Sequence, residues 1–357
     1  MRFVNGLIAS VSAEANRPVR RALIIGPNWI GDTVMAMPAV RAWRRRHPDA
    51  RLLVAARRPQ DELWTMHGAA DEVLAMPSGT AGTLVAAWAI RRWRPDRVYV
   101  LLHSIRSTLL ALSAGAPCSA MPGLFRRMLG FRVCSPCGGH QQFESADVLL
   151  GPGSDSELEA PTITIPEEAV REARTLLAGL PAGPRVAVMP GAARGPAKRW
   201  PAERFAEVAR RLAAECGCVI LALGSPDEAP ACARLASAAG AAGRDLSGRT
   251  RLPVWAALLA TSEFALANDS GGMHLATAVG RPGVAVFGAT DPHKTGPLRP
   301  DWIVVRSPGA GCRNVGRRDA DAIQRLTAVT ADEVFEACRR LLKLRRPDRQ
   351  AGGGMDG

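Results

Sequence analysis

The chain has 357 residues, of which 47% are apolar, and it carries a formal net charge of +13. This length and apolar content exclude a single small module and predict two ordinary domains of about 150 residues each. No window reaches the ~18 uncharged apolar residues that cross a bilayer, and the start of the chain lacks a convincing signal peptide, so we expect a cytoplasmic protein.

Short apolar strands alternate with helical segments along the first part of the chain. The predicted strands are 22–27, 51–56, 72–76 and 97–102, and the predicted helices are 33–46, 58–67, 81–94 and 105–114. This alternation predicts one doubly wound parallel unit. The stretch from 120 to 165 is rich in Pro, Gly and Ser and is predicted to be a loop-rich connection.

The alternation resumes further along the chain and predicts a second doubly wound unit. The predicted strands are 186–190, 218–224, 264–268, 283–288 and 302–306, and the predicted helices are 201–215, 227–239, 253–261, 271–279 and 330–345. The last helix has an N-cap threonine and an acidic first turn.

We therefore expect an α/β protein with two Rossmann-like doubly wound domains. The expected parts are an N-terminal extension at 1–19, a first domain at 20–165, a second domain at 166–329, a terminal helix at 330–345 and a disordered tail at 346–357. Ligands of such sheets bind beyond the carboxyl ends of the strands, so the loops that follow the strands are the places to look for function.

The loop Gly26-Pro-Asn-Trp-Ile-Gly-Asp32-Thr33 follows the first strand and leads into a helix. Asp32 has two interpretations. It could cap the helix, which the spacing alone favours, or it could project into the crevice as a general base.

A glycine-rich loop that ends in Lys198 follows the strand at 186–190. Lysine is rare in this chain, with three residues against 43 arginines, and a compact point charge at the end of such a loop suits a phosphate. The alternative is a solvated surface lysine. The surrounding glycines, which let a backbone approach a ligand, and Pro201, which starts the next helix, favour the phosphate interpretation.

Two acids follow the strand at 218–224. Asp227 and Glu228 could accept hydrogen bonds from ribose hydroxyls, as acids at the end of a second strand commonly do. They could equally be ordinary acids at a helix N-terminus.

The segment Asn268-Asp-Ser-Gly-Gly-Met-His274 follows the strand at 264–268. Asp269 or Ser270 could cap the next helix, whereas Gly271 and Gly272 would leave successive amides open to an anion. His274 could be a structural or a catalytic histidine, and the structural interpretation is favoured.

Two further motifs carry little weight. Gly288-Ala-Thr-Asp-Pro-His-Lys-Thr295 nearly matches the triphosphatase loop, but His293 replaces the second glycine and Pro297 falls where that loop needs a helix. Cys134-Ser-Pro-Cys137 is a lone pair, so neither zinc binding nor a disulfide framework is expected.

The positive charge is concentrated in the first half of the chain. Residues 1–150 hold 19 Arg and 10 Asp or Glu, a balance of +9, and the remainder holds 27 basic and 23 acidic residues, a balance of +4. Arginine could simply solvate the surface, or it could attract an anionic partner such as an anionic lipid surface. Nucleic acid is not expected, because the chain has one tyrosine and no recognisable binding motif.

Three segments together carry a resemblance to a known family. GPNWIGDTVMAMPAVRAWRRRHP, PGAARGPAKRWP and NDSGGMHLATAVGRPGVAVFGATDPHKTGP resemble signatures of the ADP-heptose lipopolysaccharide heptosyltransferases of glycosyltransferase family 9, heptosyltransferase II in particular. The segments His103–Ser107 and Asp245–Thr250 are also similar, and the resemblance covers about residues 21–345.

The resemblance implies a GT-B architecture, in which two Rossmann-like domains face a central cleft, with the acceptor bound by the first domain and the sugar nucleotide by the second. It also implies an inverting, metal-independent transfer of heptose from ADP-L-glycero-D-manno-heptose to the lipopolysaccharide inner core, without a cofactor.

The resemblance further implies roles for single residues. Asp32 would be the base that deprotonates the acceptor hydroxyl, and Lys198 would stabilise the departing diphosphate. The implied donor-binding residues are Gly191, Lys198, Asp227, Glu228, Asn268, Asp269, Ser270, Gly271, Gly272 and His274. The implied acceptor-binding residues are Asn28, Gly31, His103 and Arg106, and no metal site is expected.

The implied acceptor, a lipid A-Kdo/heptose inner core, is anionic and embedded in a membrane. The basic first half of the chain would then favour peripheral association with the inner face of the cytoplasmic membrane, weakened by salt. Two alternatives remain open: a family 9 transferase with a different acceptor, and a non-catalytic protein that binds a sugar nucleotide or an anionic lipid.

Overall fold

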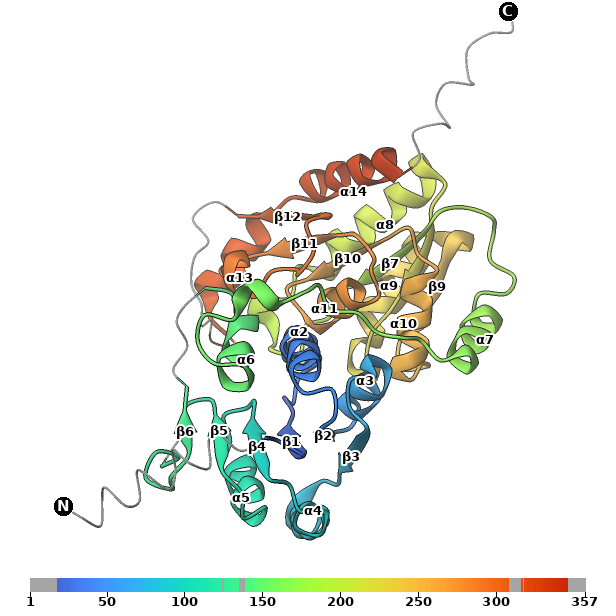
Figure 1. The fold of residues 1–357 in the computed structure, drawn as a ribbon. Coiled ribbons are helices and arrows are strands. Elements are labelled where there is room, and N and C mark those ends of the chain that lie inside the picture. The colour runs from blue at the N-terminus through green and yellow to red at the C-terminus, as the bar shows by residue number, and fades with distance from the viewer. Residues whose placement is uncertain (1–17, 124, 135–138, 308–315, 317, 346–357) are drawn as a thin grey trace, which may run out of the picture. The chain divides into compact units, whose positions relative to one another are not determined.

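The computed structural model describes residues 18–123, 125–134, 139–307, 316 and 318–345, and the chain divides into two compact units, Met1–Glu159 and Ala160–Gly357 (Figure 1). Most of the extension expected at 1–19, all of the tail expected at 346–357, and Cys137 lie outside the described residues.

The first unit is built on one six-stranded sheet of order β3-β2-β1-β4-β5-β6, in which all neighbouring strands are parallel. The strands are β1 Arg21–Ile25, β2 Arg51–Arg57, β3 Glu72–Met76, β4 Arg97–Val100, β5 Cys118–Ala120 and β6 Arg132–Val133. The helices are α2 Ile30–Arg46, α3 Gln60–His67, α4 Gly79–Trp93, α5 Ile105–Ser113 and α6 Gln142–Leu149. Helices α2, α3 and α6 cover one face of this sheet and α4 and α5 cover the other (Figure 1).

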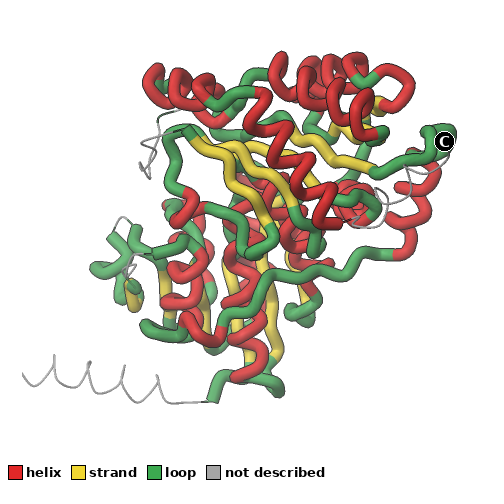
Figure 2. The backbone as a smooth tube through the Cα atoms, turned by 90° about the horizontal axis from the view of Figure 1, so that it is seen from above, coloured by secondary structure: helices red, strands yellow, loops and turns green. Residues whose placement is uncertain are grey.

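The second unit repeats this arrangement, with a parallel sheet of order β12-β11-β10-β7-β8-β9. Its strands are β7 Arg185–Met189, β8 Val219–Ala222, β9 Gly243–Asp245, β10 Phe264–Asn268, β11 Gly283–Phe287 and β12 Trp302–Arg306. Its helices are α7 Glu167–Leu176, α8 Ala202–Cys216, α9 Ala229–Ala238, α10 Leu252–Ala260, α11 Gly271–Ala278, α12 Pro292–Thr295, α13 Ala320–Ala328 and α14 Ala331–Arg345. Seen from above, helices flank the strands of each sheet (Figure 2).

The central strands are continuous apolar runs because helices cover both faces of each sheet. Residues 22–25 of β1 and all five residues of β10 are buried, which is the pattern expected of parallel strands. Burial on both faces removes the alternation of apolar and polar residues that marks a strand with one exposed face. The length of the apolar run is therefore the signal that predicts these strands. The predicted α/β class with two doubly wound units is confirmed.

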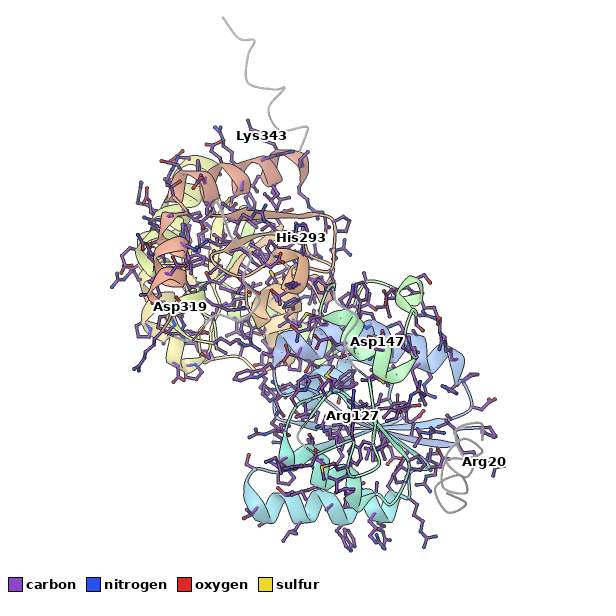
Figure 3. The ribbon with its side chains drawn as sticks, turned by 90° about the vertical axis from the view of Figure 1, so that its left-hand side faces the viewer. Arg20, Arg127, Asp147, His293, Asp319 and Lys343 are labelled. Carbon is purple, nitrogen blue, oxygen red and sulfur yellow. The ribbon has the colours of Figure 1, made fainter. Side chains whose placement is uncertain are left out.

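The loop predicted at 120–165 is wrong in part, because β6 and α6 lie within it. Strand β6 has only two residues, too few for a periodic pattern. Helix α6, which carries Asp147 (Figure 3), buries polar residues beside apolar ones. Because Ser145 and Asp147 are among the buried residues, the buried face shows no clear apolar pattern in the sequence. The pattern also does not predict β5, α7, β9, α12 or α13.

The predicted N-cap of the last helix is confirmed. The Thr330 hydroxyl accepts a hydrogen bond from the Glu333 amide at 3.2 Å, and the Glu333 carboxylate accepts one from the Thr330 amide at 2.8 Å. This reciprocal pair is a capping box. Helix α14 then buries Val334, Phe335 and Cys338 in the core of the second unit.

His67 gives the first unit a pH-dependent stability. Its side chain is buried at the end of α3 against the ring of Trp64, and burial, aided by the charge of Arg41, lowers the pKa of its imidazole from 6.5 to about 3. Between pH 6.5 and about 3, His67 therefore binds a proton in the unfolded chain but not in the folded chain. The stabilisation is complete above pH 6.5 and is lost as pH falls from 6.5 towards 3, by about 1.4 kcal/mol per pH unit.

We therefore expect urea unfolding to show a lower free energy of unfolding at about pH 5 than at about pH 7.5. The variant His67→Phe should lose less stability over this interval than the unmodified chain. The exposed His103 provides the matched control, and His103→Gln should keep the original pH dependence. An unchanged pH dependence in His67→Phe would contradict the assignment.

Candidate functional site

The strand order of each sheet reverses at its centre, between β1 and β4 in the first unit and between β7 and β10 in the second. Open α/β sheets bind ligands at such switch points, beyond the carboxyl ends of the two strands. The loops that carry Asp32, His103, Lys198 and Asp269 follow these four strands, and the loop of Asp227 and Glu228 follows the neighbouring strand β8. The fold therefore brings the first four loops together in pairs, one pair in each unit.

One glycine allows the turn of the loop that follows β7, and one asparagine holds this loop by hydrogen bonds. Gly195 has a φ of +97°, which glycine adopts without strain, and the short 3₁₀ turn Pro196–Lys198 follows it. Asn268, fully buried at the end of β10, accepts a hydrogen bond from the Trp200 amide at 3.0 Å and donates one to the Pro190 carbonyl at 2.7 Å. Asn268 therefore holds the loop near its start, at Pro190, and near its end, at Trp200.

Lys198 is not a solvated surface lysine. Its ammonium group lies 2.5 Å from the Asp269 carboxylate, and the two side chains are only 12% and 6% exposed. The same carboxylate oxygen accepts a weaker hydrogen bond from the Thr295 hydroxyl at 3.4 Å. A cation and its counter-ion are therefore held together, with little solvent, at the switch point of the second unit.

The N-terminus of α11 lies directly after Asp269. Ser270 is the N-cap residue, but its side chain makes no capping hydrogen bond, and the first amide to reach back to the cap carbonyl is that of His274. The preceding amides of Gly271 and Gly272 therefore have no partner within the helix and suit an anion. A Cβ on Gly272 would lie 2.6 Å from the Met189 sulfur, so glycine lets α11 pack closely on β7.

His274 and Asn268 lie too deep to be simple ligand contacts. His274 is 3% exposed within α11, in agreement with the structural interpretation. Asn268 is 0% exposed and its side chain is engaged with the loop. Asn268 therefore shapes the backbone around the site, and His274 lies buried within α11.

Glu228 lies against the loop of Lys198. Its carboxylate accepts a hydrogen bond from the Ser225 amide at 2.8 Å, in a capping box that starts the turn Pro226–Glu228. A Cβ on Gly191 would lie 1.7 Å from a Glu228 oxygen, so only glycine fits at that position. Asp227 is exposed on the same turn. Glu228 therefore caps this turn through one carboxylate oxygen, while its other oxygen lies beside Gly191.

In the first unit, Asp32 is not the N-cap of α2. The N-cap is Trp29, and Asp32 is the third residue of the helix, where its half-buried carboxylate accepts a hydrogen bond from the Gln141 amide group at 3.2 Å. Asn28 lies in the turn before the helix and Gly31 in its first turn. The favoured spacing-based interpretation, helix capping, is therefore wrong in its strict form.

Two predicted acceptor residues follow β4. His103 is exposed and its ring Nδ1 contacts the Pro122 carbonyl. Arg106, in the first turn of α5, donates a hydrogen bond to the Pro77 carbonyl at 2.6 Å. Both side chains connect the loop after β4 to neighbouring loops of the same unit.

Arg126 is a residue that sequence reasoning missed. It is fully buried, and its guanidinium donates to the Leu102 and Met121 carbonyls, each at 2.7 Å, and to the Ser107 hydroxyl at 2.9 Å. It therefore holds the loop that carries His103. One arginine among 43 gave no signal in the sequence.

In the part of the chain that the structure describes, no group of three or more His, Cys, Asp or Glu residues is placed so as to hold a metal ion. None of the described helices combines the length and apolar composition needed to span a bilayer.

Two doubly wound sheets, with a paired lysine and open helix amides at one switch point, define a nucleotide-binding class of α/β protein. Comparison with known families identifies which one. The model of glycosyltransferase family 9 (heptosyltransferase) matches residues 87–320, and the chain belongs to this family. The predicted resemblance to this family is confirmed.

Individual relatives extend the match over most of the chain. Lipopolysaccharide heptosyltransferase 2 of Escherichia coli strain K12 is 28% identical, with 90% of this chain and 98% of the relative covered. Its counterpart in Salmonella typhimurium is 29% identical with the same coverage. The solved structure of E. coli ADP-heptose LPS heptosyltransferase II is 27% identical, with a TM-score of 0.76, and the match covers 91% of this chain and 99% of that one.

The protein is therefore a glycosyltransferase with the expected two-domain α/β fold. The alternative of a non-catalytic binding protein is not supported.

Proposed function

We propose that the protein transfers heptose from ADP-L-glycero-D-manno-heptose to the inner core of lipopolysaccharide. The names of its full-length relatives support both the donor and the acceptor. The observation that carries the proposal is the Lys198–Asp269 pair beside the open N-terminus of α11, because a cation and free amides in a shielded site suit a diphosphate.

In this proposal the second unit binds the donor. The diphosphate lies beside the Lys198 ammonium, which Asp269 holds in position, and accepts hydrogen bonds from the amides of Gly271 and Gly272. Asp227 and Glu228 bind the adenosine ribose, and Gly191 leaves room beside them. Asn268, Ser270 and His274 act on the donor by holding this backbone in place.

The first unit binds the acceptor. Asp32 accepts the proton of the acceptor hydroxyl, and the hydrogen bond from Gln141 orients its carboxylate. Asn28, Gly31, His103 and Arg106 lie at the same strand ends and contact the acceptor sugars.

The reaction then balances without a metal. The acceptor oxygen forms a bond to the anomeric carbon of heptose, the bond from that carbon to the β-phosphate oxygen breaks, and ADP leaves with the electron pair. The proton goes to Asp32, and attack from the face opposite ADP inverts the anomeric centre. Lys198 and the α11 amides stabilise the negative charge that develops on the diphosphate.

The acceptor is part of a membrane lipid, so we further propose that the enzyme works in the cytoplasm, at the inner face of the cytoplasmic membrane. The net charge of +13 favours approach to such an anionic surface.

The test is incubation of purified protein with ADP-heptose and heptose-deficient lipopolysaccharide, with and without a chelator. We expect ADP release coupled to heptose incorporation in both cases, and an inverted anomeric centre by NMR of the product. A parallel reaction uses a core that already carries its first heptose. Transfer only to a different acceptor would replace the proposed substrate, and loss of activity with the chelator would contradict metal independence.

A further inference from the structure

Exposed apolar side chains gather on one face of the first unit. Among the described residues, nine of the eleven exposed large apolar side chains lie on α4, on α5 and in the segment 125–129. Leu84 and Trp88 on α4 are 73% and 65% exposed, Ile105 on α5 is 66% exposed, and Met128 is 83% exposed. We call this surface the α4–α5 face.

The exposed residues of the α4–α5 face are not those that hold the helices to the sheet. Helix α4 buries Gly82, Ala86 and Ile90, and α5 buries Leu110 and Ala111. Each helix therefore has a second apolar stripe, spaced at three to four residues, on its outer side. Contiguous apolar surface of this kind normally marks a binding surface.

A basic cavity opens at the C-terminal ends of the same two helices. It has a volume of about 920 Å³, and its lining includes four arginines, Arg21, Arg91, Arg92 and Arg94, beside the ring of Trp88, but no carboxylate. Arginines at a helix C-terminus complement its dipole, which accounts for some of this charge. The helix dipole does not account for Arg21, because this residue belongs to β1.

Two backbone positions on this surface are also unusual. Arg94 and Phe125, with φ of 53° and 59°, are the non-glycine residues with positive φ in the described part of the chain. Glycine is the ordinary residue for that conformation. One of these residues lines the basic cavity, and the other exposes 59% of a phenylalanine on the α4–α5 face.

We propose that the α4–α5 face docks on an anionic lipid bilayer. Its apolar side chains enter the boundary between headgroups and acyl chains, and the cavity arginines bind lipid phosphates. The positive charge of the cavity favours a bilayer over a second copy of the chain as the partner. A two-fold dimer through the same face would bring two arginine clusters together. The inference rests on the proposed function, because an enzyme whose acceptor is part of a membrane lipid must approach the membrane. It assigns the α4–α5 face as the surface that contacts the bilayer.

The test is flotation of the full chain with vesicles that contain no acceptor. We expect binding to phosphatidylcholine vesicles that include phosphatidylglycerol, little binding to phosphatidylcholine alone, and release by salt. The double variants Leu84→Ser/Trp88→Ser and Arg91→Ser/Arg92→Ser should each weaken binding by roughly ten-fold or more. The matched control, Leu344→Ser/Arg340→Ser on the exposed side of α14, should bind like the unmodified chain.

Transfer to a lipid-free core oligosaccharide should be unchanged in both α4 variants, which shows that they remain folded. Wild-type binding by these variants would overturn the proposal, and so would a dimer in solution that the Leu84→Ser/Trp88→Ser change dissociates. Because the vesicles lack acceptor and donor, this result is independent of heptose transfer. A protein that fails the transfer assay can still pass or fail this test.

Discussion

Replacement of Asp32 with asparagine is expected to lower kcat by about 10²–10⁴-fold, because the amide cannot take the acceptor proton. Asparagine keeps the shape of the side chain and can still pair with Gln141. The Kd for ADP-heptose, measured by calorimetry, should stay within about two-fold, since the proposed donor contacts belong to the other unit.

Asp61, in the first turn of α3, provides the matched control for this variant. Like Asp32, it is a partly exposed acid at the start of a helix in the first unit. Asp61→Asn should leave kcat unchanged. If Asp32→Asn kept full kcat, or instead lost ADP-heptose binding, Asp32 would not be the base.

Lys198→Met is expected to lower kcat by about 10²–10³-fold, in the range found when one donor to a developing anion is removed. It should also weaken binding of both ADP-heptose and ADP, because the ammonium contacts the diphosphate before and after transfer. Single-turnover measurements of the chemical step, alongside the Kd for ADP, would separate the two effects.

The same variant leaves the buried Asp269 carboxylate without its cation, which should cost about 3–5 kcal/mol of stability. The double variant Lys198→Met/Asp269→Asn removes both charges. It should recover most of the free energy of unfolding but none of the activity. Lys343→Met, on the exposed side of α14, is the control and should behave like the unmodified chain. Recovery of activity in the double variant would show that Lys198 serves only to neutralise Asp269.

The sequence predicted the sheets better than the connections between them. Strands β10 and β12 have the predicted bounds, because each is a run of four apolar residues that ends at a polar one. Helix α6 was missed because polar residues are buried on it, and β6 because it is too short. The place of β6 in the sheet depends on its pairing with β5, which no local sequence pattern predicts.

The site was predicted as separate loops and not as a network. The glycines around Lys198 and Asp269 indicated phosphate binding at each loop, but the ion pair joins residues 71 positions apart in the chain. Thr295, dismissed with the triphosphatase-like motif, proves to be a neighbour of the same carboxylate. Such long-range contacts depend on the strand order, which follows from the whole fold.

The two sheets share one strand order, so the chain uses a single sheet topology twice, with different helices and connecting segments in each half. Residues of the central strands β1, β4, β7 and β10 are mostly buried and are constrained by packing, whereas loops tolerate more change than the strands that they connect. A change of sugar or acceptor preference can therefore arise in these loops while the framework keeps its stability. This separation explains how relatives under 30% identical can retain one architecture.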